Sequence, residues 1–249
     1  EMLCYVVFFF YKTFLLFYDY LYYIKFFYKN NVFLIPNYIM KLSVIIPCYN
    51  EIKTIQEIIK RVKNEKNYEK EIIVIDDSSN DGTREILESQ LSKEINKLLL
   101  NEKNFGKGYC VRKGIEVATG DVIIIQDADL EYEPSDYVKL VEPIKNNYAD
   151  VVYGSRFIGS EEKRVLFFWH SIGNFLLTTF SNMLTNLNLS DIENCYKTFK
   201  AEIIKKIELK ENRFGFEAEI TAKISKKKLR IYEVGVKYHG RTYSEGKKI

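Results

Sequence analysis

The sequence has few of the residues that most often build metal centres and acid–base catalysts. Only two histidines are present, His170 and His239, and neither lies in an evident motif for a general base. The four cysteines are far apart in the chain and form no CxxC pair, so their spacing argues against a zinc site. This pattern fits reduced thiols in a cytoplasm best.

A strong excess of charge of one sign is also absent. The chain has 37 Lys and Arg residues against 34 Asp and Glu residues, which gives a formal net charge of +3. Proteins that bind nucleic acid normally have a much stronger basic bias, so nucleic acid is not an expected partner. The length of 249 residues, 47% of them hydrophobic, is enough to bury the core of one large domain.

The first 39 residues differ from the rest of the chain. From Met2 to Pro36 the chain is rich in Phe, Tyr, Leu and Ile, but four charged residues interrupt this stretch: Lys12, Asp19, Lys25 and Lys29. A spanning helix needs about 20 mostly apolar residues, and a charge near the bilayer centre costs about 2.5–3.5 kcal/mol, so this segment is a marginal span. It also lacks the short apolar core and cleavage site of a secretory signal. Two interpretations of residues 1–39 stay open: a membrane-associating leader, or non-native upstream sequence ahead of Met40.

From Met40 onward, patterns typical of strands alternate with patterns typical of helices. Strands are predicted at Leu42–Ile46, Ile72–Ile75, Lys97–Leu100, Asp121–Ile125 and Asp150–Arg156, with an edge strand at Leu229–Tyr238. Helices are predicted at Ile52–Val62, Thr83–Leu91, Pro134–Lys145 and Phe216–Lys226, and one more ends near Val117. Pro47 is expected to stop the first strand. This alternation predicts an α/β domain with a mostly parallel sheet and helices on both faces.

Two acidic residues, Asp127 and Asp129, follow an unbroken apolar run, Val122–Ile125. Such a run is typical of a buried strand in a parallel sheet, and ligands of open α/β sheets bind outside the carboxyl ends of the strands. Residues i and i+2 of an extended chain lie on the same side, so both carboxylates can reach one cation while the small Ala128 lets a ligand approach. We interpret the pair as a divalent-metal site that holds a diphosphate. The alternative is that the two acids are only turn or helix-cap residues.

Three other features have more than one interpretation. Asn104–Gly108 contains the sequence GKG but lacks the glycine spacing and the Ser or Thr of a Walker A loop, so a glycine-permitted turn into a helix is favoured over phosphate binding. Arg156 is either a surface charge or a phosphate partner, since its guanidinium donates in a fork. Arg164–Leu187 is an amphipathic helix that either packs on the sheet or lies in a membrane surface, because Trp and Phe stand opposite a polar face.

The motifs of the chain, in this order, resemble those of the family 2 glycosyltransferases, and within them the polyprenyl-phosphate sugar transferases of the dolichol-phosphate mannose synthase type. The matching stretches are Ser43–Glu51, Ile75–Thr83, Asn104–Gly114, Gln126–Glu131 and Gly154–Arg156. The resemblance covers about residues 41–249. It implies a GT-A, Rossmann-like fold for a catalytic domain at residues 40–249, with Mg or Mn as the cofactor.

The resemblance also implies where the donor binds. Pro47, Tyr49 and Glu51 would line the pocket for the base and ribose, and Ile75 and Asp77 would lie beside the nucleoside. The donor would be a nucleotide-diphosphate sugar of the GDP-mannose or UDP-glucose type.

A second set of implied positions concerns the metal and the phosphates. Asp127 and Asp129 would hold the metal that bridges the diphosphate, with Ala128 packed on the donor. Glu131 would be a further metal ligand, at a position where these synthases often have glutamine. The cationic positions Arg156, Arg241 and Lys247 match those associated with donor or acceptor phosphates, and Asp127, Asp129 and Arg156 would form the catalytic set.

The implied reaction is the inverting transfer of a hexose to a polyprenyl phosphate, dolichyl or undecaprenyl, presented at a membrane surface. The enzyme would be peripheral or weakly anchored at the cytoplasmic face. A bound divalent ion, with Arg and Lys nearby, would stabilise the negative charge on the leaving group. The acceptor phosphate is already anionic near neutral pH, so it needs little help from a general base.

Three alternatives stay open. A family 2 transferase that acts on a sugar hydroxyl in cell-surface polysaccharide synthesis would need a carboxylate base, for which Glu193 and Glu219 are candidates. A phosphoacceptor receiver domain would also have acids such as Asp76 and Asp77 after a strand, but it expects them on the first strand, and here a full strand and helix precede them. The third alternative is a fragment that binds a nucleotide sugar without turnover.

Overall fold

The computed structural model describes residues 40–160, 162–165 and 167–246. The leader predicted at residues 1–39 and the phosphate-binding Lys247 lie outside the described residues, so these two stay predictions. Within the described part, the strands form a 7-stranded sheet in the order β3-β2-β1-β4-β6-β5-β7. Their bounds are Lys41–Cys48 for β1, Glu69–Asp76 for β2, Lys97–Leu100 for β3, Val122–Ile125 for β4, Val151–Ser155 for β5, Lys197–Lys200 for β6 and Ile231–Gly235 for β7.

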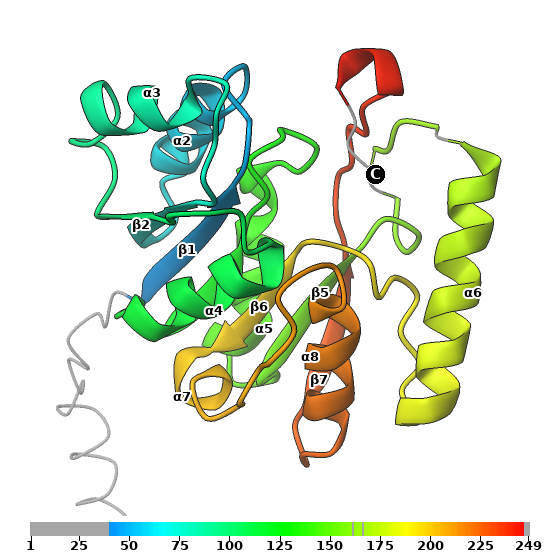
Figure 1. The fold of residues 1–249 in the computed structure, drawn as a ribbon. Helices are drawn as coiled ribbons and strands as arrows, with labels where there is room; N and C mark the ends of the chain where they lie inside the picture. Colours follow the sequence, from blue (N-terminus) through cyan, green and yellow to red (C-terminus); the bar gives the residue numbers. More distant parts are fainter. Residues whose placement is uncertain (1–39, 161, 166, 247–249) are drawn as a thin grey trace, which may run out of the picture. The chain divides into compact units, whose positions relative to one another are not determined.

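Helices occupy both faces of the sheet, as the alternating pattern predicts (Figure 1). In this view α4 and α8 lie in front of the sheet, and α5 lies behind it and packs on β5 and β6. The described helices are α2 (Ile55–Asn64), α3 (Thr83–Ser89), α4 (Lys107–Val117), α5 (Tyr137–Lys145), α6 (Phe168–Thr185), α7 (Ala201–Ile204) and α8 (Phe216–Ser225), with short 3-10 helices η1 (Pro134–Asp136) and η2 (Tyr243–Glu245).

Most of the sheet is parallel, which confirms the predicted class. β1 pairs in parallel with β2 and β4, and β5 pairs in parallel with β7 at the edge of the sheet. The sequence pattern does not predict β6, which runs antiparallel to both β4 and β5. The sequence of this strand, KTFK, has no apolar run that would indicate a buried strand. Lys197 is nevertheless fully buried, because its Nζ donates to the backbone carbonyl oxygens of Ile192 and Asn194. These hydrogen bonds allow a charged residue to be buried in the sheet, so hydrophobicity alone does not reveal the strand.

The expectation that Pro47 stops the first strand is wrong, since β1 continues to Cys48. The reason is the direction of the backbone hydrogen bonds. The carbonyl oxygen of Ile45 accepts a hydrogen bond from the amide of Gln126, so the backbone of Ile45 points toward β4, and so does that of Pro47 two residues later. β4 ends at Ile125, opposite Ile45, so no paired strand needs the N–H group that proline lacks.

β1, β2 and β4 run in the same direction, so their carboxyl ends meet at one edge of the sheet. In the register of the sheet, Cys48 lies opposite Asp76, and Ile45 lies opposite Ile125. The acidic residues that follow β2 and β4 are thereby brought to the same edge. That edge is where ligands of open α/β sheets bind.

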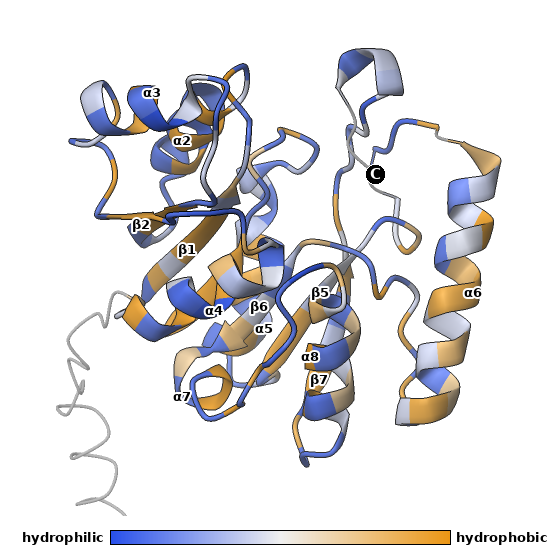
Figure 2. Ribbon diagram, viewed as in Figure 1, coloured by the Kyte–Doolittle hydropathy of each residue, from blue (hydrophilic) through white to orange (hydrophobic). Residues whose placement is uncertain are grey.

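α6 buries polar residues and exposes apolar ones, which is the reverse of an ordinary helix that covers a sheet. Its buried residues are Asn174 and Thr178, whereas Trp169 is 77% exposed, Phe180 63% and Met183 77%. Figure 2 shows how much of this helix is hydrophobic. The alternative in which the helix buries its apolar stripe against the sheet is therefore wrong.

A series of polar side chains attaches α6 to the rest of the domain. Asn174 Oδ1 accepts a hydrogen bond from Arg156 at 3.3 Å. Thr178 accepts one from the backbone of the segment 189–192, and Asn182 exchanges two hydrogen bonds with the same segment. These three residues are spaced four apart, so they share one face of the helix. Among the residues that the structure describes, no helix combines the length and the hydrophobicity that crossing a bilayer requires.

α4 packs directly on β1 at Gly114. A Cβ atom added to Gly114 would lie 2.4 Å from Cγ2 of Ile45, which is fully buried. This contact determines how closely α4, and the turn that precedes it, approach the sheet.

Gly114→Ala is expected to lower the free energy of unfolding by about 1–3 kcal/mol, because the added methyl group overpacks the contact with Ile45. Gly173→Ala is the matched control, since Gly173 is also helical but has nothing within 4 Å of an added Cβ atom. The control is expected to gain up to about 1 kcal/mol, because glycine is a poor helix former. Urea unfolding measures both changes, and equal changes in the two variants would contradict the close contact.

Candidate active site

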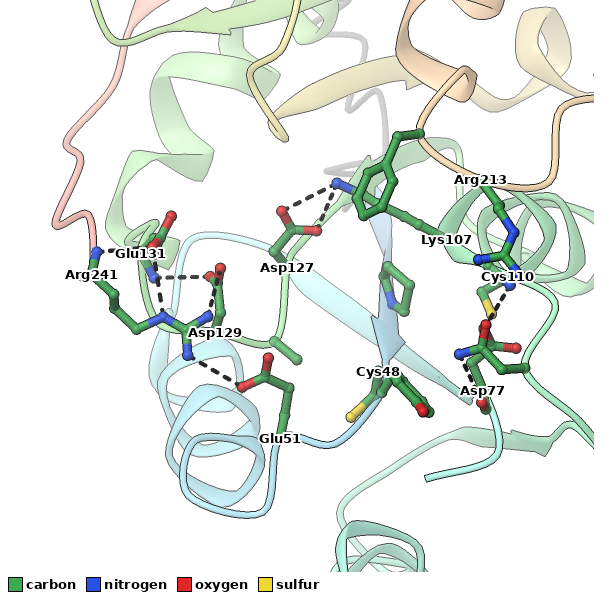
Figure 3. A pocket seen from close by; sticks show the side chains of 16 residues that line it. Cys48, Glu51, Asp77, Lys107, Cys110, Asp127, Asp129, Glu131, Arg213 and Arg241 are labelled. Carbon is green, nitrogen blue, oxygen red and sulfur yellow. Dashed lines mark hydrogen bonds and ion pairs between the residues drawn. The ribbon is translucent and has the colours of Figure 1, made fainter. Parts of the chain in front are cut away.

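A cavity of about 490 Å³ opens at the edge of the sheet where β1, β2 and β4 end (Figure 3). Pockets that bind small molecules typically have volumes of about 300–1,000 Å³. The lining residues are Pro47, Cys48, Tyr49, Glu51, Asp77, Asn104, Gly106, Lys107, Cys110, Asp127, Ala128, Asp129, Glu131, Arg213, Phe214 and Arg241.

All but three of the predicted site residues line this cavity. Ile75 is fully buried within β2 and does not line it. Arg156 does not line it either, and Lys247 lies outside the described residues. The structure therefore brings together the positions predicted for the donor and the metal, and it leaves the roles assigned to these three residues as predictions.

Arg156 follows β5, and other residues of the domain engage its guanidinium. The two oxygens of the buried Asp191 each accept a hydrogen bond from it at 2.7 Å, and it lies over the ring of Tyr238 at 5.1 Å from the centroid. The arginine joins the end of β5, the segment after α6 and the segment after β7. The buried carboxylate of Asp191 thus pairs with the guanidinium for which the sequence predicts a phosphate.

Asp77 holds the glycine turn that precedes α4. Its Oδ1 accepts a hydrogen bond from the amide of Phe105 at 2.9 Å, and its Oδ2 accepts one from the amide of Gly106 at 2.7 Å. Gly106 has a φ of +104°, a conformation that favours glycine, and α4 begins at the next residue. The interpretation of GKG as a turn into a helix is confirmed. Asp77 and Asp129 lie at opposite ends of the cavity in Figure 3.

The same glycines allow a close approach by a segment that is distant in the sequence, Glu211–Phe214. A Cβ atom would lie 2.5 Å from a backbone carbonyl oxygen of this segment if added to Gly106, and 2.4 Å if added to Gly108. This contact brings Arg213 and Phe214 into the lining of the cavity. No local signal in the sequence identifies them, because only a tertiary contact joins the two segments.

Lys107, the first residue of α4, lies between two carboxylates. Its Nζ is 3.0 Å from Asp127 Oδ1 and 3.2 Å from Asp127 Oδ2. It is also 3.1 Å from Oε1 of Glu217, a residue of α8 that is 4% exposed. The GKG pattern indicates a turn of the backbone, and no local signal in the sequence shows that the lysine side chain pairs with these two carboxylates.

Arg241 enters the same end of the cavity from the C-terminal segment. Its guanidinium nitrogens lie 3.2 Å from Asp129 Oδ2, 3.5 Å from Glu51 Oε2 and 3.6 Å from Glu131 Oε1 (Figure 3). Burial, together with the charges of Asp127 and Glu131, raises the pKa of Asp129 to about 7. Three carboxylates thus share one guanidinium at this end.

Glu131 holds the C-terminal segment against the pocket. Its Oε2 accepts a hydrogen bond from the Tyr238 hydroxyl at 2.8 Å, and its Oε1 accepts one from the backbone amide of Arg241 at 2.9 Å. Its role as a third metal ligand stays a prediction. The described part of the chain contains no group of three or more His, Cys, Asp or Glu side chains arranged to hold a metal ion.

The two carboxylates considered as a general base do not line the cavity. Glu219, in the first turn of α8, pairs with Lys223 at 2.7 Å and accepts hydrogen bonds from backbone amides of the segment before the helix. Glu193 is half-buried, and burial followed by the charge of Glu217 raises its pKa.

Known proteins resemble the chain over most of its length. A sequence model of glycosyl transferase family 2 matches residues 43–208. The dolichol-phosphate mannosyltransferase of Pyrococcus furiosus is 32% identical over 219 residues, which are 84% of this chain and 61% of that protein. The undecaprenyl-phosphate mannosyltransferase of Micrococcus luteus is 26% identical over 222 residues, which are 84% of this chain and 87% of that protein. The chain therefore spans less than two thirds of the first of these relatives.

Solved structures share the fold. The glucosyl-3-phosphoglycerate synthase of Mycobacterium tuberculosis, in complex with Mg²⁺ and uridine diphosphate, has a TM-score of 0.61 at 17% identity, over 83% of this chain and 74% of that one. Another mycobacterial protein has a TM-score of 0.64 at 16% identity, over 83% of this chain and 69% of that one. At such identities the likeness shows the fold alone, and with the family match it confirms the predicted GT-A architecture.

The raised pKa of Asp129 leads us to expect a pH-dependent stability in the metal-free protein. An unfolded chain loses this proton near the ordinary aspartate pKa of about 4, whereas the folded protein loses it at about 7. Between these values the folded state holds the extra proton, so the free energy of unfolding falls as the pH rises through this range. Asp129→Asn removes that loss and is expected to be more stable than the wild type by about 1–3 kcal/mol near pH 8, with a smaller advantage near pH 5.

Urea unfolding in the presence of a chelator, at both pH values, measures this difference. Glu116→Gln, on the exposed side of α4, is the control and is expected to behave like the wild type at both. An Asp129→Asn variant with the same advantage at both pH values would contradict the raised pKa.

Proposed function

The chain belongs to glycosyl transferase family 2, and from that premise we propose that it transfers a hexose from a nucleotide-diphosphate sugar to a polyprenyl phosphate at a membrane surface. The two mannosyltransferases to which it is similar are named for dolichol phosphate and undecaprenyl phosphate, which supports an acceptor of this class. The proposed cofactor is Mg²⁺ or Mn²⁺.

The observation that carries this proposal is the distribution of groups along the cavity. At one end Asp127 and Asp129 follow β4 with the small Ala128 between them, an arrangement that suits a cation-bound diphosphate. At the other end Asp77 and Cys110 combine hydrogen-bonding groups with apolar surface, which suits the base of a nucleoside, and Pro47 also lines the cavity. A nucleotide-diphosphate sugar likewise has a base at one end and a charged diphosphate farther along its length.

The donor set at the acidic end suits a divalent cation. Mg²⁺ at substrate phosphates is typically bound by only one or two protein carboxylates, while the phosphates supply further oxygens. Asp129 is crowded by burial and by its acidic neighbours, so a cation beside it would favour its charged form. When bound there, the ion would neutralise negative charge on the leaving diphosphate.

The residues of the chain would act by binding and positioning. Asp77 and the glycine turn would hold the nucleoside end, while Asp127 and Asp129 would hold the diphosphate end. Arg241 lies at the acidic end, where a guanidinium can stabilise charge that develops on the leaving group. The acceptor phosphate is anionic near neutral pH, so the reaction needs a positioned nucleophile more than a general base.

The outer face of α6 supports a membrane surface as the place of reaction. The residues from 165 to 184 whose apolar side chains are more than half exposed are Val165, Phe168, Trp169, Phe175, Leu176, Leu177, Phe180, Met183 and Leu184. Helices that lie in the plane of a membrane surface have such an apolar face with Trp and Phe. Because polar side chains attach α6 to the domain, its apolar face is left for contact with lipid.

Asp127→Asn and Asp129→Asn are each expected to reduce sugar transfer at least about a hundredfold, because each removes a negative charge from the proposed metal site. Transfer from GDP-mannose and from UDP-glucose to a polyprenyl phosphate, with Mn²⁺ or Mg²⁺, is measured after lipid extraction. Glu116→Gln is the surface control and is expected to keep full activity. Near-normal transfer by either Asp variant, with an unchanged metal requirement, would contradict the metal assignment.

Trp169→Glu combined with Phe180→Glu is expected to abolish sedimentation with anionic liposomes, because the two charges remove the apolar hold of α6. A version of the protein that starts at Met40 excludes any contribution from residues 1–39. The control is Tyr148→Glu combined with Tyr232→Glu, which adds the same charge at exposed aromatic residues outside α6.

The control protein is expected to sediment like the wild type. A wild-type protein that stays in the supernatant, and that prefers a water-soluble hydroxyl acceptor to a polyprenyl phosphate, would favour the hydroxyl-acceptor alternative instead.

A further inference from the structure

Lys107 has two carboxylate partners, and only one of them is a proposed metal ligand. Its Nζ contacts both oxygens of Asp127, at 3.0 and 3.2 Å, and Oε1 of Glu217 at 3.1 Å. The side chains of Lys107 and Glu217 are 19% and 5% exposed, so this ion pair lies behind the pocket rather than on the surface. The second oxygen of Glu217 is buried, and among the described residues it has no hydrogen-bond partner.

The position of Lys107 has an electrostatic consequence for metal binding. The oxygens of Asp127 that a divalent cation would use are those that the ammonium group contacts. The ammonium and the divalent cation therefore compete for the same atoms, and their like charges repel each other strongly at contact distances. A metal ion at Asp127 would therefore be bound more tightly if Lys107 withdrew from Asp127.

Glu217 offers a place for the withdrawn ammonium. One of its oxygens already contacts Lys107, and the other is buried without a partner, which is costly for a carboxylate. An ammonium group that turns from Asp127 to Glu217 would supply this missing partner without leaving the interior. The side chain of lysine has rotatable donors on a flexible stem, which such a movement needs.

We propose that Lys107 is the resident counter-ion of the metal site and that Glu217 receives it when the metal binds. This inference rests on the proposed function, since it requires a divalent cation at Asp127. Both residues are positioning residues that set the affinity for the metal, and the exchange keeps the buried carboxylates neutralised in both states. α4 and α8 thereby contribute to the metal site without supplying a ligand.

The test is a titration of the metal-free chain of 249 residues with Mn²⁺, in which electron paramagnetic resonance measures the free ion. Lys107→Met removes the competitor and is expected to lower the Kd for Mn²⁺ at least about fivefold, whereas Lys107→Arg keeps the charge and stays within about twofold of the wild type. Lys113→Met is the matched control, because Lys113 lies on the same helix and pairs with Glu116 away from the pocket. It is expected to leave the Kd unchanged.

A double-mutant cycle separates the role of Glu217 from its own negative charge. Glu217→Gln is expected to raise the Kd for Mn²⁺ several-fold in the wild-type background, because Lys107 then has only Asp127 as a partner. In the Lys107→Met background the same substitution is expected to have little effect. An equal loss in both backgrounds would mean that Glu217 acts through its own charge, and the proposal would be wrong. The double variant also removes both members of the pair, so it guards against unfolding caused by one unpaired buried charge.

The titration is repeated with GDP and with UDP, so that a failure of the proposed metal site can be told from a failure of this inference alone. A wild-type protein that binds no Mn²⁺ under any of these conditions overturns the proposed metal and this inference with it. A wild-type protein that binds Mn²⁺, with an affinity that Lys107→Met leaves unchanged or weakens, overturns this inference alone.

Discussion

The crowding of carboxylates at the carboxyl ends of β1 and β4 is the constraint on which the rest of the site depends. Parallel strands bring Asp127, Asp129 and Glu51 to one edge, and burial makes their repulsion stronger. Cationic side chains from two distant segments form ion pairs with these carboxylates: Lys107 at the start of α4 and Arg241 near the C-terminus. The ion pairs also hold these segments at the pocket. Ion pairs therefore add to packing in holding this end of the site together.

At the other end of the cavity, near Asp77, close packing of the backbone holds the segments together. Asp77 accepts hydrogen bonds from the amides of the glycine turn, and the missing side chains of Gly106 and Gly108 let the segment 211–214 approach. Gly114 brings the body of α4 against β1 in the same way. One helix thus begins beside Asp77, carries Lys107 toward Asp127 at the proposed metal site, and packs on the central strands. A displacement of α4 would alter both ends of the cavity together.

The attachment of α6 follows a different rule from that of the other helices. Its buried stripe is polar, and Arg156, bound to Asp191, also contacts Asn174 on this stripe. The arginine that the family resemblance associates with phosphate is therefore part of the joint between the sheet and the proposed membrane-binding helix. Because hydrogen bonds hold the helix in place, its apolar residues are not needed for the core. They are exposed, as the proposed contact with a membrane requires, whereas an ordinary amphipathic helix buries its apolar residues against the sheet.

The sequence by itself determined the alternation of strands and helices, because that depends on local periodicity along the chain. It also indicated that Asp127 and Asp129 follow a buried strand at the edge of the sheet where ligands bind, and both line the cavity. It did not determine that Pro47 stays within β1, since that depends on where a neighbouring strand ends. It also could not reveal that Lys107 pairs with Asp127 and Glu217, because three segments distant in the sequence supply these groups. For α6, periodicity identified which residues share a face. Only the tertiary structure decided which face is buried, because burial depends on the groups that other segments offer to it.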